Sequence, residues 1–562
     1  MNLKQLLADS VESRGDAVAF RYKSGGEWQT CAYRAFLEKV RTVSELLGGL
    51  RIRPGERVGL FADNSMEWAA IYFGIVGSGA IAVPIDAKLQ ELELAHILTD
   101  SRARILFCGA RQYPLVRERH HQLRDLEHVL VLNGGKALDL ASAKAPVTYT
   151  DLAAAMEQAA EGAAGAKAFY DRVEPGDDDV ASLIYTSGTT GRQKGAMLTH
   201  GNFTSNVASC RRAWPITGDD NFLLVLPMHH AFAFTGNLLL PLACGSSISL
   251  VESLRTVGEN IRDVSPTAFI GVPLLIEKMY ERIFAKLRQN RTAWLMWSLG
   301  LRGPIRRRIR AQLGGKLRIV VTGGAPCDPD ILRGYQALGV SIVEGYGLTE
   351  AAPVLTLNPP DAPKPGSIGR PLSGVEIRIV DPNEQGVGEL AARGPNIMKG
   401  YFRNPEATAE VLRDGWLYTG DLGRIDDEGY ITLAGRKKSL IVNREGKNIY
   451  PEEVEVQVLK SPYLLEALVL GYQEPTDKVG ERVGLIVVPN LEQFDHDARR
   501  RGRAFTDAEL MARVRDEVRR VTRDLSEYKR PRKVQVRMEE FEKTSTSKVK
   551  RYLYEMDSAS VD

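Results

Sequence analysis

At 562 residues, the chain is too long for one hydrophobic core and should divide into at least two domains. Its 44% hydrophobic and 26% charged residues are those of an ordinary globular protein. A formal net charge of +3 on this length argues neither for nor against nucleic acid, and we predict no nucleic-acid partner.

Cysteine usage and the N-terminus indicate a protein of a reducing compartment. The five cysteines are odd in number and widely scattered, and no CxxC or CxxH pairing suggests zinc, so we interpret them as free thiols. Residues 1–7 lack the apolar core of a signal peptide. Two charge-free runs, 69–85 and 221–251, are interrupted by glycine and proline, so neither is expected to span a bilayer. We therefore expect a soluble, cytoplasmic protein.

Up to about residue 108 the pattern alternates between helix and strand. A helical period covers 33–47, and apolar strands are predicted at 57–62, 79–85 and 104–108. Strands that alternate with helices indicate parallel sheets with helices on both faces. Residues 141–168, rich in alanine and small side chains, are interpreted as a poorly specified surface excursion.

A predicted strand at 181–185 runs directly into a stretch of small hydroxyl residues and glycines that ends at Lys194. Glycine lets the backbone approach a ligand closely, and N–H groups and hydroxyls suit phosphate oxygens, so the stretch predicts a phosphate-binding loop. It is not a Walker A loop, because Gly188 and Gly191 are three apart and Lys194 precedes a glycine. Taken alone, these residues are equally compatible with a surface turn.

Residues 277–315 are predicted to form a helical, charged insertion. It contains Trp294 and Trp297, followed by arginines from Arg302 onward. Aromatic residues beside a basic cluster suit an anionic membrane surface, so residues 293–310 are a candidate for peripheral membrane contact. A solvated basic helix with its tryptophans packed inward is about as compatible with the pattern, and both interpretations stay open.

Two later segments, 320–326 and 343–350, are predicted strand ends that open into glycine turns. In open α/β sheets, ligands collect at such carboxyl ends. Short strands and Gly/Pro turns over 366–400 indicate a smaller β subdomain. Near Lys438 the pattern changes, and the basic final section, with helices expected from Pro451 and over 507–525, predicts a small α+β domain.

Five blocks of this chain, in their order along it, resemble the adenylate-forming superfamily of acyl-CoA synthetases, adenylation domains and luciferases. The blocks are the phosphate loop with 197–202, Gly323-Gly-Ala-Pro326, the stretch from Glu344 to Glu350, Tyr418-Thr-Gly-Asp421, and Lys548 with the Val-Lys-Arg after it. Five blocks in order are far more specific than any one of them. Within the superfamily, the chain looks most like AMP-forming acyl-CoA synthetases of the medium- to long-chain fatty acid type.

The resemblance implies an α/β fold. Residues 1–437 would form a large N-terminal domain of two packed, mixed or parallel α/β sheets plus a β subdomain, which binds ATP and the acyl substrate. Residues 438–562 would form a small, mobile α+β C-terminal lid that carries the catalytic lysine and a thioester-forming loop. Lys438 would be the hinge between the two catalytic poses.

The resemblance also implies the nucleotide-binding residues. The residues that would hold the β- and γ-phosphates of ATP are Thr186, Ser187, Gly188, Thr189, Thr190, Gly191 and Lys194. The adenine pocket would be formed by Gly324, Ala325, Pro326, Glu344, Gly345 and Tyr346. Thr349 would bond the α-phosphate, and the carboxylate of Glu350 would ligate Mg²⁺, which favours oxygen.

The remaining roles are also implied by the resemblance. Asp421 would accept the ribose hydroxyls, with Arg436 as the second ribose contact, and Gly446 would belong to the thioester-forming loop. Lys548 would draw the carboxylate and the α-phosphate together, although Ser547 stands where the family usually has glycine. His230 is the preferred candidate beside the acyl pocket, and the adjacent His229 is an open alternative.

The predicted reaction joins a carboxylic acid to coenzyme A at the expense of ATP, through an acyl-AMP, with Mg²⁺ as cofactor. Three alternatives stay open. The first is an acyl-AMP ligase that loads a carrier protein; such enzymes usually have an extra inserted segment, which is not evident near 370–435. The second is an aryl-acid CoA ligase, which is less favoured because of the insertion at 277–315. The third is a non-catalytic scaffold, which would not need Lys548. A homodimer is compatible with the sequence.

Overall fold

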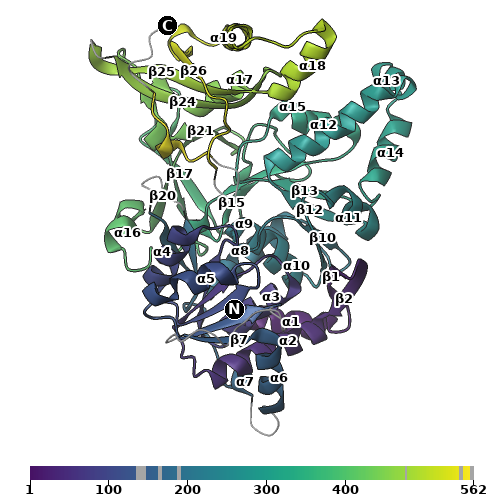
Figure 1. Cartoon of the computed structure of the whole chain (residues 1–562), viewed down its shortest axis with the longest axis vertical. Coiled ribbons are helices and arrows are strands. Elements are labelled where there is room, and N and C mark those ends of the chain that lie inside the picture. Colours follow the sequence, from purple (N-terminus) through teal and green to yellow (C-terminus); the bar gives the residue numbers. More distant parts are fainter. Residues whose placement is uncertain (134–146, 163–167, 187–191, 475–476, 544–548, 557–562) are drawn as a thin grey trace. The chain divides into compact units, whose positions relative to one another are not determined.

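The computed structural model describes residues 1–133, 147–162, 168–186, 192–474, 477–543 and 549–556 (Figure 1). The chain forms two compact units. The first comprises 1–188, 192–377 and 392–417, and the second comprises 189–191, 378–391 and 418–562. The predicted domain boundary near Lys438 stays a prediction.

A seven-stranded sheet in the first unit contains the predicted N-terminal strands. Its order is β7-β6-β5-β3-β4-β8-β9, parallel throughout except for the antiparallel pair β8–β9. Its strands are β3 (Arg57–Phe61), β4 (Ile81–Ile85), β5 (Ile105–Gly109), β6 (His128–Leu132), β7 (Thr148–Asp151), β8 (Val180–Thr186) and β9 (Lys194–Thr199). The four predicted strands at 57–62, 79–85, 104–108 and 181–185 correspond to β3, β4, β5 and β8, whereas β6, β7 and β9 were not predicted.

A nine-stranded sheet forms the other layer of the first unit, in the order β16-β15-β14-β13-β12-β10-β11-β1-β2. Its central strands, from β14 to β1, are parallel. Its strands are β1 (Val18–Ser24), β2 (Glu27–Ala32), β10 (Asn221–Leu224), β11 (Ser247–Leu250), β12 (Ala268–Gly271), β13 (Ile319–Thr322), β14 (Val343–Gly347), β15 (Val354–Leu357) and β16 (Arg370–Pro371).

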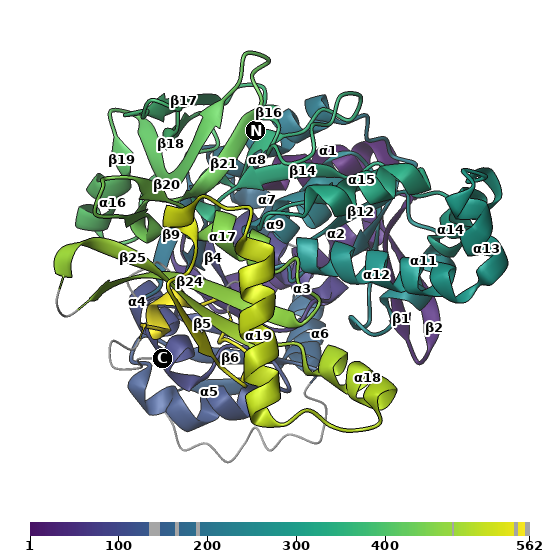
Figure 2. The ribbon, with the colours of Figure 1, turned by 90° about the horizontal axis from the view of Figure 1, so that it is seen from above.

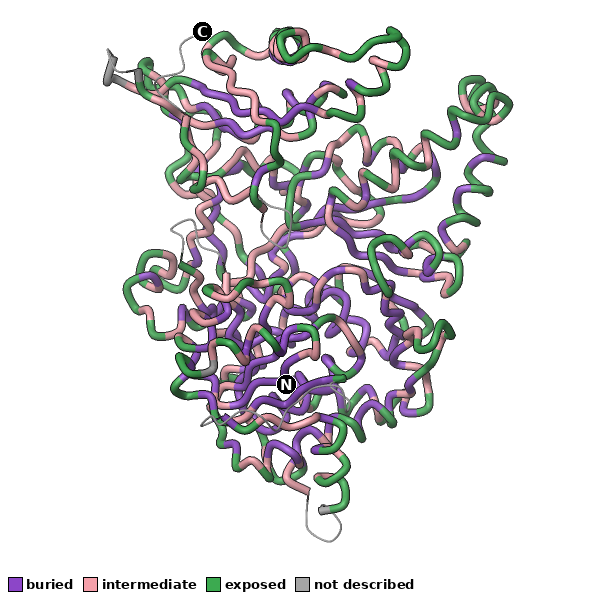
Figure 3. Tube along the Cα trace, in the orientation of Figure 1, coloured by how far each residue is buried: buried purple, intermediate pink, exposed green. Residues whose placement is uncertain are grey.

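Helices cover these sheets, and buried residues follow the strands (Figure 3). In the helix α3 every residue except Glu67 is buried, because the other residues are apolar or small. The helices of this unit are α1 (Leu3–Arg14), α2 (Tyr33–Gly49), α3 (Met66–Gly77), α4 (Glu91–Ser101), α5 (Tyr113–Arg119), α6 (Leu152–Gly162), α7 (Phe169–Arg172), α8 (His200–Ala213), α9 (Ala231–Ala233), α10 (Leu240–Ala243), α11 (Val257–Val264), α12 (Pro273–Gln289), α13 (Arg291–Ser298), α14 (Gly303–Gln312), α15 (Pro329–Leu338) and α16 (Pro405–Val411).

The predicted surface excursion at 141–168 is partly wrong. Residues 148–151 form β7, which pairs with β6 at the edge of the sheet, and α6 packs on α2. Alanine and methionine on α6 provide that apolar contact, so low sequence complexity here does not mean absent structure. Residues 141–146 and 163–167 lie outside the described residues.

The second unit holds the α+β section. Its three-stranded sheet β24-β25-β26 packs against α17 and α19. The helix α17 starts with Pro451, and α19 starts with a capping box at Thr506. Its helices and strands are β20 (Trp416–Ile425, in part), β21 (Ile431–Arg436), β22 (Ile441–Val442), β23 (Asn448–Ile449), α17 (Pro451–Val458), β24 (Leu464–Glu474), β25 (Asp477–Pro489), α18 (Leu491–Arg501), α19 (Asp507–Thr522) and β26 (Lys533–Val536). Within the predicted β subdomain at 366–400, β17 (Glu376–Val380) and β18 (Gly388–Arg393) belong to a five-stranded sheet. Its other strands, β19 (Leu412–Arg413), β20 and β21, lie beyond the predicted bounds.

All five cysteines are free thiols, as predicted. Four are buried and Cys244 is half-buried, and burial raises the pKa of each thiol, to about 12 for Cys210 and about 11 for Cys244. Among the described helices, none is both long and apolar enough to cross a bilayer.

Candidate active site

Two glycine turns meet at the carboxyl ends of β13 and β14. The strands are parallel, with Thr322 opposite Glu344, so the turn after β13 lies beside the turn at the end of β14. A Cβ built on Gly323 would lie only 2.9 Å from the carbonyl oxygen of Gly345, so only glycine fits there. The next three residues, which include Ala325 and Pro326, are exposed, and the predicted adenine-binding segments are therefore brought together.

Glu344 is a buried carboxyl group at this edge, only 8% exposed. Burial raises its pKa to about 7, although backbone N–H groups of Gly366 and Cys327 donate to it and oppose the shift. Gly345 and Tyr346, the two residues after it, are half-buried. The site therefore contains an acid whose charge changes near neutral pH.

Replacing Glu344 by glutamine should remove a pH dependence of stability. The folded-state pKa of about 7 lies above the ordinary value of 4.5, so the folded protein holds an extra proton between these values. This contribution is present below about pH 4.5 and is lost as the pH rises through 7, by at most about 3 kcal/mol. Between pH 5 and pH 8, the Tm of the wild type should fall several degrees relative to E344Q. Parallel Tm profiles would show that Glu344 keeps an ordinary pKa.

Thr349 and Glu350 lie in the short 3₁₀ helix η4 (Thr349–Ala351) that follows β14. The hydroxyl of Tyr401 donates a 2.7 Å hydrogen bond to Oε1 of Glu350, and the backbone N–H of Met398 donates to the Glu350 carbonyl at 2.8 Å. Oε2 of Glu350 makes no hydrogen bond with the described residues. A carboxylate held by one oxygen, with the other available, fits a hard cation such as Mg²⁺.

Tyr401 also joins the phosphate-loop strand to Glu350. The ammonium of Lys194 lies 5.3 Å from the centre of the Tyr401 ring, and Ala196 forms a β-bridge with Tyr401. Thr186 pairs with Lys194 across β8 and β9, so both ends of the predicted loop come to this position. The loop residues between them, Ser187, Gly188, Thr189, Thr190 and Gly191, lie outside the described residues.

Sequence reasoning did not identify Tyr401. It lies 51 residues after Glu350, in a segment without a recognised motif, and the only signal available was a Lys-Gly-Tyr-Phe run between predicted strands. Burial and the neighbouring Glu350 raise the pKa of its phenol, which therefore stays a hydrogen-bond donor.

Removing the Tyr401 hydroxyl should leave the Glu350 carboxylate less firmly positioned, because its hydrogen bond at Oε1 is lost. A hydrogen bond to a charged group contributes about 1.5–3 kcal/mol, so Tyr401→Phe should lower the rate of acyl-AMP formation at least about tenfold and raise the Mg²⁺ concentration that gives half-maximal rate. Tyr22→Phe, in β1, is the matched control and should leave both values unchanged. An unaltered Mg²⁺ requirement in Tyr401→Phe would mean that Glu350 needs no such support.

The two histidines precede α9. His229 is buried and His230 is half-buried, with their ring centres 4.2 Å apart. Phe232, two residues on, reaches the turn after β13, because a Cβ on Gly323 would lie 3.4 Å from its ring. The structure thus places this segment beside the predicted adenine turn, and which histidine faces an acyl group stays a prediction.

The second unit brings the predicted ribose contacts together. Asp421 on β20 pairs in register with Arg436 on β21, and Nε of Arg436 lies 2.9 Å from Oδ1 of Asp421. Lys438 follows in an exposed turn of 3₁₀ helix, and Gly446 has a φ of +73°, which closes the turn after Asn443. Lys548 lies outside the described residues.

Arg551, three residues after Lys548, is tied to the body of the second unit. It contacts both carboxylate oxygens of Glu455 at 2.5 and 2.7 Å and donates to the carbonyl of Val469 at 3.1 Å. In the sequence, Arg551 stands out only as part of the block after Lys548, and no pattern there indicates Glu455 as its partner. Nη2 of Arg551 makes both contacts to Glu455, so this ion pair anchors the chain at Arg551.

The geometry agrees with the comparisons to known proteins. Residues 7–402 match the AMP-binding enzyme family, and residues 453–548 match the AMP-binding enzyme C-terminal domain. The chain belongs to the AMP-binding enzyme family. The predicted membership of the adenylate-forming superfamily and the predicted α/β fold are therefore confirmed.

Relatives of this AMP-binding enzyme include CoA ligases of two kinds. A long-chain-fatty-acid–CoA ligase of Mycobacterium bovis is 30% identical, over 98% of this chain and 94% of the relative. A feruloyl-CoA synthase of Amycolatopsis is 34% identical, over 81% of this chain and 83% of the relative. The ATP-bound crystal structure of MatB from Rhodopseudomonas palustris is 26% identical, covers 98% of each chain and has a TM-score of 0.76. These relatives support the predicted class of AMP-forming acyl-CoA synthetases.

Proposed function

We propose that this AMP-binding enzyme is an acid–thiol ligase that activates a medium- to long-chain fatty acid with ATP and transfers it to coenzyme A. The observation that carries the proposal is the meeting of Lys194, Tyr401 and Glu350 beside the glycine turns of β13 and β14. The long-chain-fatty-acid–CoA ligase at 30% identity over nearly the whole chain supports the substrate class.

In the first half-reaction, a carboxylate oxygen attacks the α-phosphorus of ATP, the bond to the pyrophosphate leaving group breaks, and acyl-AMP forms. Lys194 and the loop hold the β- and γ-phosphates, and the residues from Glu344 to Thr349 hold the adenine and the α-phosphate. Mg²⁺, when bound at Glu350, supplies charge neutralisation for the phosphate oxygens. Lys548 offsets the negative charge that develops at the α-phosphoryl group.

In the second half-reaction, the thiolate of coenzyme A attacks the acyl carbon, and AMP leaves with the electron pair of the broken C–O bond. The loop that contains Gly446 replaces Lys548 at the acyl group when the small domain turns about Lys438. Alignment of reactants supplies most of the rate in both steps, because no covalent enzyme intermediate is needed.

An aryl acid is the second candidate substrate, and the feruloyl-CoA synthase at 34% identity is the observation that favours it. AMP release should therefore be measured with acetate, octanoate, palmitate, benzoate and ferulate, each with coenzyme A. The highest kcat/KM is expected for octanoate or palmitate. If ferulate or benzoate is the better substrate, the fatty-acid assignment is wrong.

Changing Lys548 to alanine should separate the two half-reactions. Carboxylate-dependent exchange of labelled pyrophosphate into ATP should fall by at least about a hundredfold, whereas thioester formation from supplied acyl-AMP should continue near the wild-type rate. Lys438→Pro is the reciprocal variant and should spare the exchange reaction but block thioester formation. Equal loss of both half-reactions in Lys548→Ala would refute its assigned role.

We further propose that α13 and α14 rest on an anionic membrane surface. Both helices lie together at the margin of the first unit (Figures 1 and 2). Trp297 packs inward on Phe284, but Leu295, Leu299 and Leu301 are 57–67% exposed. Residues 291–316 contain basic but no acidic side chains, and the arginines of α14 are exposed. Exposed apolar groups beside unopposed basic charge suit acidic lipid headgroups.

Vesicle sedimentation tests this contact. The protein should bind vesicles that contain phosphatidylglycerol, bind phosphatidylcholine vesicles weakly, and be released by salt. Arg307→Glu combined with Arg308→Glu should reduce binding at least about tenfold. Arg499→Glu with Arg500→Glu, on α18, is the matched control and should retain binding. Equal binding to the two kinds of vesicle would contradict the proposal.

A further inference from the structure

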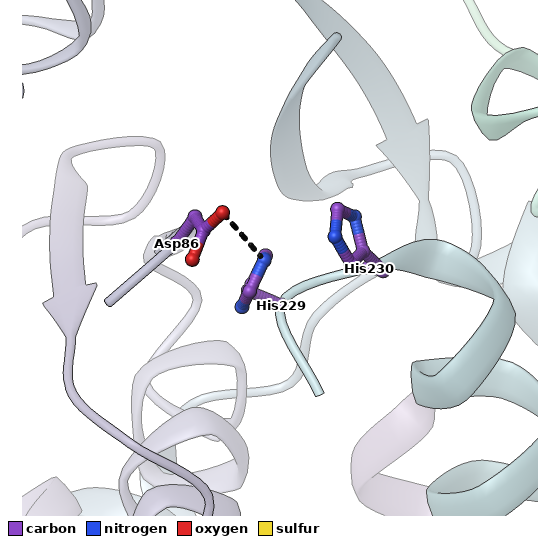
Figure 4. Close-up of side chains that lie close together, drawn as sticks. All are labelled: Asp86, His229 and His230. Carbon is purple, nitrogen blue, oxygen red and sulfur yellow. Dashed lines mark ion pairs between the residues drawn. The ribbon is translucent and has the colours of Figure 1, made fainter. Parts of the chain in front are cut away.

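Three metal-capable side chains from distant parts of the sequence meet in the first unit. Asp86 follows β4 directly, and His229 and His230 precede α9 (Figure 4). One ligand atom from each side chain lies within 4.8 Å of the other two. Imidazole nitrogens and carboxylate oxygens are ligands that Zn²⁺ and related transition metals use in proteins.

The spacing of Asp86 and His229 is compatible with two ligands of one ion. Nε2 of His229 lies 3.5 Å from Oδ2 of Asp86, whereas N–H···O hydrogen bonds are about 2.7–3.2 Å long. Two tetrahedral ligands, each about 2.0–2.1 Å from Zn²⁺, are about 3.3–3.4 Å apart.

His229 is buried and Asp86 is half-buried. The His229 side chain is 9% exposed and that of Asp86 is 11% exposed. Nε2 of His229 makes no hydrogen bond with the residues that the structure describes. Burying a ring nitrogen without a hydrogen-bond partner is costly, and a metal ion bound to Nε2 of His229 would remove that cost.

Backbone contacts hold the ligands in place. The N–H of Lys88 donates to Oδ1 of Asp86 at 3.0 Å, which leaves Oδ2 directed at His229. The side chain of Asn64 accepts from the N–H of Met228 and donates to the carbonyl of Leu226, both at 2.8 Å, and so fixes the segment before His229. Ligands that are held before an ion arrives lose little freedom on binding it.

We propose that Asp86, His229 and His230 form a binding site for a divalent transition metal of the Zn²⁺ class. The site is distinct from Glu350, the carboxylate predicted to ligate Mg²⁺. Mg²⁺ does not compete for it, because a hard cation prefers six oxygen ligands to two imidazoles.

Zinc binding by the full chain tests this site. Zn²⁺ affinity is measured by competition with a chromophoric chelator in millimolar Mg²⁺, and Co²⁺ serves as a spectroscopic probe of tetrahedral geometry. We expect one Zn²⁺ per chain, with affinity at least about tenfold weaker in Asp86→Asn and in His229→Gln. Asp86→His keeps a ligand and should restore tight binding. Asp63→Asn and His128→Gln, in the same unit, are the matched controls.

These measurements need no turnover, so they stand apart from the fatty-acid assignment. Circular dichroism and Tm establish that each variant is folded. Wild-type protein that binds no Zn²⁺ at micromolar concentration overturns the proposal. Folded Asp86→Asn and His229→Gln variants that bind Zn²⁺ as tightly as the two controls also overturn it.

Discussion

The candidate active site depends on the parallel register of β13 and β14. Because Thr322 lies opposite Glu344, the two strands end together, and the glycine turns that follow them share one edge of the nine-stranded sheet. At that edge the backbones approach so closely that a methyl group on Gly323 would collide with the carbonyl of Gly345. If this register shifted by one residue, the two turns would no longer lie side by side, and the proposed nucleotide site would not form.

Tyr401 connects the seven-stranded sheet, which contains β9, to that edge of the nine-stranded sheet. Its segment pairs with β9 through the Ala196 bridge, while its hydroxyl bonds the carboxylate of Glu350. Tyr401 therefore holds the strand that follows the predicted phosphate loop close to Glu350, the predicted metal ligand. The contact lies within the first unit, so it needs no residue of the second unit.

Much of this arrangement could be predicted from the sequence, because local patterns carry it. The alternation of helices and strands over the first hundred residues, and the turns at Gly323 and Glu344, follow from apolar periodicity and glycine placement. Tyr401 and Asp86 could not be found in this way, since their partners lie 51 and more than 140 residues away and only tertiary packing joins them. The strand β7 was not predicted, because its four residues are too few to show an alternating pattern within an alanine-rich stretch. The role of Lys548 stays a prediction.

The burial of the cysteines has a consequence for an enzyme that handles a thiol substrate. Thiol–disulfide exchange requires a thiolate and access to it, and the protein restricts both, since four of its thiols are buried and burial raises the pKa of all five. Mixed disulfides between the protein and oxidised coenzyme A should therefore form slowly while the chain stays folded. We therefore expect the packing of the core to protect the enzyme from inactivation by disulfides.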